Sequence, residues 1–352
     1  AILGYLTVIV LYLLAKRLFN EQTAVVTALV SGLYPNFILY SLTFYSETLA
    51  LFFVVSSFFF LAGHLQTSRL FDALAGGIFW GLASQTRGGL VYFSLFVALT
   101  LMAYRAHRRP AAAARAAAGF LMACLGTFIA VGMAAQPVHD GLAVNSRNGV
   151  VAVVLGANRI TVASTDYGNI RGNLYYDITQ CNDSWPAGSR MRIEDLSELG
   201  TIEVLDRVVR FVSADTMLYL KNALLKLSTF WSPNQDSIGY LRTKLRGAAG
   251  PAGLISCIFI SAYYLLVVAG GIAGMGIAPG PFRIICVLFM VFYSMMIFLT
   301  VGNTRLRIPL MPWFMVYCAY FITRLVSEPP PGRRLSSPAA RRCCCKRRPP
   351  TT

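Results

Sequence analysis

Charged side chains are scarce in this chain. Asp, Glu, Lys and Arg make up 13% of its 352 residues, whereas a soluble globular domain has about 25%. Hydrophobic residues make up 56% and come in long blocks, and about 20 apolar residues are enough for a helix to cross the hydrocarbon core of a bilayer. The composition therefore argues against an ordinary soluble protein. It predicts an all-α polytopic membrane protein.

Motifs for metal, nucleotide and covalent chemistry are also missing. Of the eight cysteines, four lie in apolar runs, three are consecutive near the C-terminus and Cys181 stands alone in the polar region, so they form neither a disulfide framework nor metal-ligand spacing. The chain contains no P-loop, no dinucleotide-binding glycine motif and no nucleophile elbow. We therefore expect no metal and no cofactor. The basic tail lacks interleaved aromatic residues, which favours contact with anionic lipid over nucleic acid.

The apolar blocks define the domain organisation. We count nine segments, which begin near Ile2, Thr23, Thr48, Phe71, Leu90, Ala116, Ala252, Pro281 and Ile308. About nine transmembrane helices are thus expected, in residues 1–135 and 251–326. Residues 136–250 form a polar region between helices six and seven, and residues 327–352 form a basic tail that is expected to be disordered. The chain starts inside an apolar run without Met, so we expect that an N-terminal part is missing.

The polar region holds eleven of the fifteen acidic residues. The stretch from Gly149 to Asn158 has the composition of a strand. The stretches from Glu194 to Val212 and from Thr216 to Phe230 carry apolar residues at helical spacing. We therefore expect a small mixed α/β domain.

Basic residues in short loops predict the orientation in the membrane. If the nine helices alternate, Lys16, Arg17, Arg69, the run Arg105–Arg115 and the tail all fall on one side, which is then cytoplasmic. The polar region lies on the opposite side. The expected location is the inner (plasma) membrane, with an extracytoplasmic domain.

A few charges fall on the outer side, where they are costly or unusual. Glu47 lies near the edge of an apolar block, so it is either a functional carboxylate or an N-terminal acid favoured by the helix dipole. Arg87 could reach lipid headgroups, but Arg305 and Arg307 fall on the same side, where arginine is uncommon. Three such arginines indicate a phosphate-binding role, because the guanidinium binds phosphate with two hydrogen bonds.

Other residues have simpler interpretations. We expect Glu21 and Asp72 to be solvated charges in or near cytoplasmic loops. Most of the aromatic residues near the outer face are expected to belong to the interfacial aromatic belt. These aromatic residues are Tyr34, Tyr40, Tyr45 and Trp313.

Several stretches resemble the GT-C superfamily of membrane glycosyltransferases, in the branch of the dolichyl-phosphate-mannose protein mannosyltransferases and the lipid A aminoarabinose transferase. The similarity extends in order along the chain to about Val326. Its motifs are Arg17-Leu18-Phe19, Tyr34-Pro35, Ser46-Glu47, GLASQTRGG around Arg87 with Gly88 where a proline is common, NSRNGVVAVVLGANR, KNALLKLSTFWSPN and GNTRLRIPLMPW.

The resemblance implies a sugar transferred from a polyprenyl-phosphate donor to a lipid, glycan or protein acceptor on the extracytoplasmic face. It implies inversion at the sugar, with little or no dependence on metal. It also implies a catalytic acid in an outer loop that precedes the first segment here, so the catalytic base stays unassigned. The donor phosphate is expected at Arg305, Arg307 and Arg87. Sugar or acceptor contacts are expected from Glu47, Tyr45 and Tyr34.

Two alternatives stay open. A transporter or flippase for a lipid-linked anion would also need arginines in the membrane, but the chain has no internal repeat and no matching pair of broken helices. A truncated relative without catalytic activity is the other alternative, because the expected catalytic loop precedes the chain.

Overall fold

The computed structural model describes residues 1–42, 46–106, 110–134, parts of 206–213, 216–233, 251–300 and 304–327. The polypeptide in these ranges is helical and contains no strand. Its elements, in chain order, are α1 (Ile2–Leu18), α2 (Glu21–Gly32), α3 (Pro35–Leu42), α4 (Ser46–Thr67), α5 (Leu70–Thr86), α6 (Leu90–Ala106), α7 (Pro110–Ala134), α12 (Thr216–Trp231), α14 (Pro251–Ile277), α15 (Phe282–Leu299), the 3-10 helix η3 (Thr304–Leu310) and α16 (Met311–Ser327).

A helix lies at each of the nine predicted places, but the structure supports fewer complete spans. Five helices of the described ranges are long and apolar enough to cross a membrane, or six if the bent pair α2 and α3 is one span. The helices α1, α5 and α6 have 17 residues each, which is at the lower limit of the roughly 17 to 25 that a span needs. The nine-span topology therefore stays a prediction.

Local sequence explains the break between α2 and α3. The Asn20 side chain accepts a hydrogen bond from the Thr23 backbone N–H at 2.8 Å and so caps α2. Pro35 then opens α3, where its missing N–H costs nothing. Because a residue before proline disfavours the helical conformation, the axis bends by 60° between the two helices.

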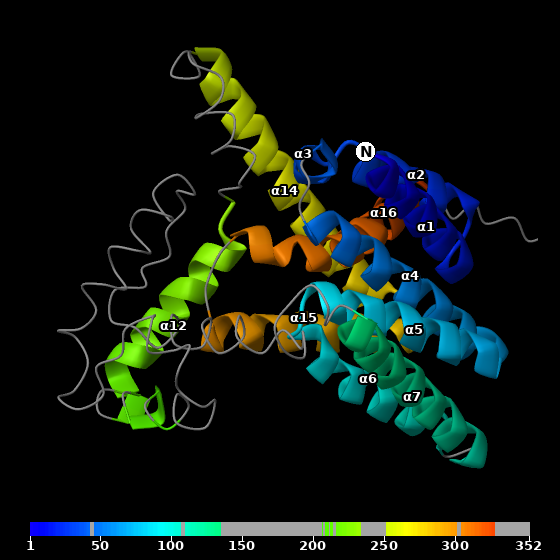
Figure 1. The fold of residues 1–352 in the computed structure, drawn as a ribbon. Helices are drawn as coiled ribbons and strands as arrows, with labels where there is room; N and C mark the ends of the chain where they lie inside the picture. The colour runs from blue at the N-terminus through cyan, green and yellow to red at the C-terminus, as the bar shows by residue number, and fades with distance from the viewer. Residues whose placement is uncertain are drawn as a thin grey trace, which may run out of the picture.

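The helices pack in two groups (Figure 1). In one group, α4 to α7 lie side by side, with α5 against α4 and α7, and α6 against α7. In the other, α16 packs against α14 and α2. The helix α1 joins the groups because it contacts both α2 and α4, while α15 extends from the core towards α12.

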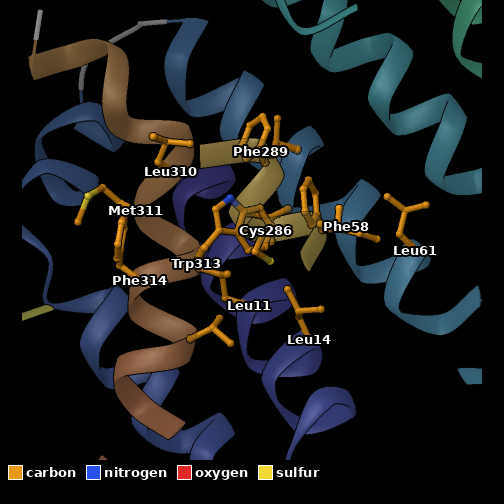
Figure 2. Packing of buried hydrophobic residues seen from close by; sticks show 14 of the residues in the cluster. Leu11, Leu14, Phe58, Leu61, Cys286, Phe289, Leu310, Met311, Trp313 and Phe314 are labelled. Carbon is orange, nitrogen blue, oxygen red and sulfur yellow. The ribbon is translucent and has the colours of Figure 1, made fainter. Parts of the chain in front are cut away.

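Aromatic side chains fill the centre where the groups meet (Figure 2). Phe58 of α4 lies on Trp313 of α16 with 4.1 Å between the ring centroids, and on Phe289 of α15 with 5.6 Å. The expectation that most of the outer aromatic residues belong to an interfacial belt does not hold for Trp313, because its side chain is fully buried among other helices. Tyr34 and Tyr40 are buried as well.

Asp72, in the first turn of α5 and next to the C-terminal end of α4, is also more buried than expected. Asp72 is 7% exposed and accepts a hydrogen bond from the Thr67 hydroxyl at 3.1 Å. The expectation that it is a solvated charge is therefore wrong. Gly63 is the reason: a Cβ there would lie 2.5 Å from Arg17 Nη1 and 3.0 Å from Asp72 Oδ2. The missing side chain lets α1 and α5 bring these two charges over α4.

Much of the predicted α/β domain lies outside the described residues. The predicted strand Gly149–Asn158 is in this part, so the strand stays a prediction. The predicted helix from Thr216 to Phe230 is confirmed as α12. Residues 206, 208–210 and 212–213, within or beside the other predicted helix, are also helical.

Replacement of Gly77 by alanine is expected to destabilise the fold. A Cβ at this position of α5 would lie 2.4 Å from the Phe120 carbonyl oxygen of α7, and one at Gly81 would lie 2.5 Å from the Cys124 oxygen. These glycines are four residues apart and let the two backbones meet, as small residues do in membrane helix pairs. Because the added methyl must push α7 away, we expect a cost of about 1–3 kcal/mol. Thermal unfolding in detergent would measure it.

Gly126→Ala is the matched control, because nothing lies within 4 Å of a Cβ at Gly126. Its melting temperature should equal that of the wild type or exceed it slightly. Equal melting temperatures for the Gly77 and Gly126 variants would show that the close approach of α5 and α7 does not matter for stability.

Candidate functional site

Glu47 and Arg87 form a buried ion pair. Arg87 Nη2 lies 3.0 Å from Glu47 Oε1, and the two side chains are only 14% and 6% exposed. Glu47 stands in the first turn of α4, where the helix dipole favours an acid. Arg87 follows the last residue of α5 in an extended conformation. The first-turn position agrees with the interpretation of Glu47 as an N-terminal acid. Its pairing with Arg87 on another element is additional to that, and a functional role for the carboxylate stays a prediction.

Tyr293 completes this group. Arg87 Nη1 donates a hydrogen bond to the Tyr293 hydroxyl at 2.9 Å, and Tyr293 belongs to α15, about two hundred residues further along the chain. The guanidinium therefore links the start of α4 to α15. We call Glu47, Arg87 and Tyr293 the outer polar cluster. Sequence reasoning missed Tyr293 because it stands in an apolar run, although a buried tyrosine hydroxyl usually has a polar partner.

The helix α12 lies next to the outer polar cluster. Its Phe230 ring stacks on Tyr293 with 6.5 Å between the centroids. One turn earlier, Lys226 is 1% exposed and donates from Nζ to the Thr300 carbonyl at 2.9 Å. Burial lowers the pKa of Lys226 from 10.5 to about 8. The amphipathic pattern of α12 gave no sign that a lysine would face the core.

The two C-terminal arginines do not join the outer polar cluster in the same way. Arg307 is fully buried, and its Nη1 donates to the Phe230 carbonyl at 2.8 Å. As the side chain lies, a phosphate group could reach it only if α12, α14 or η3 moved. For Arg305, the structure describes the backbone in η3, and its side chain is outside the description.

The other two predicted contacts are Tyr45 and Tyr34. Tyr45 lies outside the described residues. Tyr34 is fully buried, with its ring 5.2 Å from Phe37 and 6.1 Å from Tyr263 between centroids. Of the six predicted site residues, the structure therefore brings Glu47 and Arg87 into direct contact. Arg307 is linked to Arg87 only indirectly, through Phe230 and Tyr293.

The arrangement supplies a charged donor and a charged acceptor at a helix boundary. A guanidinium stays protonated at any working pH and presents several N–H groups. The electrostatic attraction between the guanidinium and an anion is stronger where water is excluded. Within the described ranges no three His, Cys, Asp or Glu side chains gather as a metal site would require. The chemistry available from the cluster itself is thus anion binding by Arg87 and hydrogen-bond acceptance by Glu47.

Replacement of Lys226 by methionine is expected to change how stability depends on pH. Because the pKa falls from 10.5 to about 8 on folding, the unfolded state binds more protons than the folded state between these values. Stability from this group therefore rises as the pH rises through that window. The melting temperature of the wild type should increase from pH 8 to pH 10 relative to that of the Lys226→Met variant. Differential scanning fluorimetry in detergent would measure both.

Lys221→Met provides the control, because Lys221 is on the exposed side of the same helix. This variant should keep the pH dependence of the wild type. If Lys226→Met also kept it, the ammonium group would not be desolvated in the folded protein.

Comparison with known proteins adds information on the first part of the chain. No curated protein matches the sequence. A family match does exist, and it covers α1 to α6 and nearly all of α7, with Glu47 and Arg87 included and Tyr293 outside it. It points to a membrane glycosyltransferase: residues 1–133 match the model of the dolichyl-phosphate-mannose-protein mannosyltransferase family.

Proposed function

We propose that the chain belongs to a membrane glycosyltransferase that takes a sugar from a polyprenyl-phosphate donor and transfers it to a lipid, glycan or protein acceptor on the extracytoplasmic face. The observation that carries the proposal is the buried pair of Glu47 and Arg87, 3.0 Å apart, inside the part of the chain that matches the mannosyltransferase family. A buried ion pair is costly to desolvate and is weak evidence for stability alone.

Arg87 is the proposed contact for the donor phosphate. Glu47 and Tyr293 fix its guanidinium from two sides at 3.0 and 2.9 Å. A donor phosphate that approaches this guanidinium would find a charge that is already oriented. Breaking the bond between sugar and phosphate leaves negative charge on the phosphate oxygens, and a fixed cation stabilises that charge as it develops. Arg305 is the second proposed contact.

Glu47 is the proposed partner for a sugar or acceptor hydroxyl. A carboxylate can accept several hydrogen bonds at once, since it has about four lone-pair sites. Tyr45 precedes it by two residues and is proposed to contact the same sugar. Tyr34, fully buried against Phe37 and Tyr263, supports the bend between α2 and α3 and would reach a sugar only after that bend opened.

A cavity lined by the first turns of α4 suits an apolar part of a substrate. It has a volume of about 220 Å³ and lies between α1, α3 and α4, with η3 at its edge. Thr48, the residue after Glu47, lines it, and so do Val8, Phe37 and Leu51. The Thr48 hydroxyl is already used, because it donates to the Tyr40 carbonyl at 2.7 Å. We propose that the first units of the polyprenyl chain, or of a lipid acceptor, enter this space.

Replacement of Arg87 by lysine is the test of the proposed function. Lysine keeps the charge but loses the planar fork that holds Glu47, Tyr293 and a phosphate together. We expect sugar transfer to fall about 100-fold or more, the size of effect seen when one donor to a developing oxyanion is removed. The assay would use the full-length protein in proteoliposomes, with a polyprenyl-phosphate donor that carries a radioactive sugar.

Arg115→Lys is the matched control, because Arg115 is exposed on α7 and bonds to a carbonyl of its own helix. It should transfer sugar at the wild-type rate. Wild-type activity in the Arg87 variant would overturn the phosphate role. Movement of the labelled donor across the membrane without transfer would replace the transferase by a transporter.

A further inference from the structure

The C-terminal end of α12 is held by side chains from two other elements. The last carbonyl groups of a helix have no partner within the helix. Here Arg307 Nη1 donates to the Phe230 oxygen at 2.8 Å and also to the Ser232 oxygen. The Tyr264 hydroxyl of α14 donates to the Trp231 oxygen between them, at 3.1 Å. Three successive carbonyls are therefore satisfied from outside α12.

The charge of Arg307 is placed where this cap needs it. The C-terminus of a helix carries partial negative charge and stabilises a cation. The guanidinium carbon also lies 4.0 Å from the centre of the Tyr264 ring, within the range of a cation–π contact. Arg307 is 0% exposed. A fully buried arginine that serves two carbonyls and an aromatic ring is committed to packing.

The same cap reaches the outer polar cluster through one residue. Phe230, whose carbonyl Arg307 binds, stacks its ring on Tyr293. Tyr293 in turn accepts the hydrogen bond of Arg87. If the end of α12 moved, Phe230 would leave the Tyr293 ring, and Tyr293 could take other rotamers. A continuous series of contacts therefore links η3 to the Arg87 guanidinium.

We propose that Arg307 and Tyr264 form a latch that positions Arg87 through Phe230 and Tyr293. In this role Arg307 is a positioning residue and does not bind the donor phosphate, which leaves that task to Arg87 and Arg305. The latch couples the C-terminal end of α12 to the helix ends where transfer is proposed. The kinetic part of the inference rests on the proposed function, whereas the packing part does not.

Two variants separate a latch from a phosphate ligand. Arg307→Met removes the charge and both hydrogen bonds, and Tyr264→Phe removes only one hydroxyl and leaves the ring. In a latch, both variants should lower kcat, by about tenfold for Arg307→Met, with little change in the donor KM. The double variant should be no worse than Arg307→Met alone, because contacting residues that act as one unit are not additive. Arg307→Lys should recover most of the rate.

Trp231 offers a measurement that needs no sugar transfer. Its ring packs against Phe230 and Phe314, with centroids at 5.1 and 5.8 Å. Release of the latch should make the fluorescence of Trp231 easier to quench with acrylamide. The contribution of Trp231 is obtained by subtracting the quenching of a Trp231→Phe protein that carries the same second substitution. We expect increased quenching in Arg307→Met and an intermediate value in Tyr264→Phe.

The latch would be overturned by unchanged quenching in Arg307→Met, whatever the activity. A rise in the donor KM of Arg307→Met, with normal Trp231 quenching, would make Arg307 a phosphate ligand instead. If the wild-type protein transferred no sugar, the proposed function would fail. The quenching experiment would still decide whether Arg307 holds α12 in place.

Discussion

The buried ion pair of Glu47 and Arg87 is stable only if the helix ends around it compensate for the lost hydration of the two charges. Two charges taken out of water cost several kcal/mol each unless good geometry and further hydrogen bonds compensate. The surrounding elements provide this compensation: α4 places Glu47 in its first turn, and α15 provides the Tyr293 hydroxyl for the second guanidinium nitrogen. Removal of either support would leave a charge that the apolar surroundings cannot satisfy.

A second level of support lies around this pair. Apolar packing drives helices together only weakly in lipid, because lipid tails are as apolar as the side chains. Close backbone contact and polar contacts must therefore hold the bundle. Gly77 and Gly81 provide backbone contact between α5 and α7. At the helix ends, Arg307 joins η3 to α12, and Asp72 lies with Arg17 over Gly63 at the other end of α4. The central helix α4 is thus fixed by charged groups at both ends.

The sequence predicts part of this arrangement, and the limits are physical. Glu47 and Arg87 could be placed on one face, because membrane cost and loop charge depend on position along the chain. The roles of Tyr293 and Lys226 could not be predicted from the sequence, since each side chain has its partner on an element distant in sequence. The prediction of an interfacial aromatic belt did not hold for Trp313, because the belt rule concerns only the depth of a residue in the membrane. It does not tell which side chains face other helices.

Arg307 is the clearest example of this limit. Its location in the structure changes how the Arg305-Leu306-Arg307 stretch is interpreted. An arginine near the outer face of a membrane protein with a phosphate substrate is readily interpreted as a ligand. What decides its role is the location of the nearest acceptors, and these are carbonyls 75 and 77 residues earlier in the chain. Two arginines that are two residues apart, Arg305 and Arg307, can therefore have different tasks. Arg307 is occupied by the end of the helix that carries Phe230, so the phosphate role proposed for Arg305 does not extend to it by sequence proximity alone.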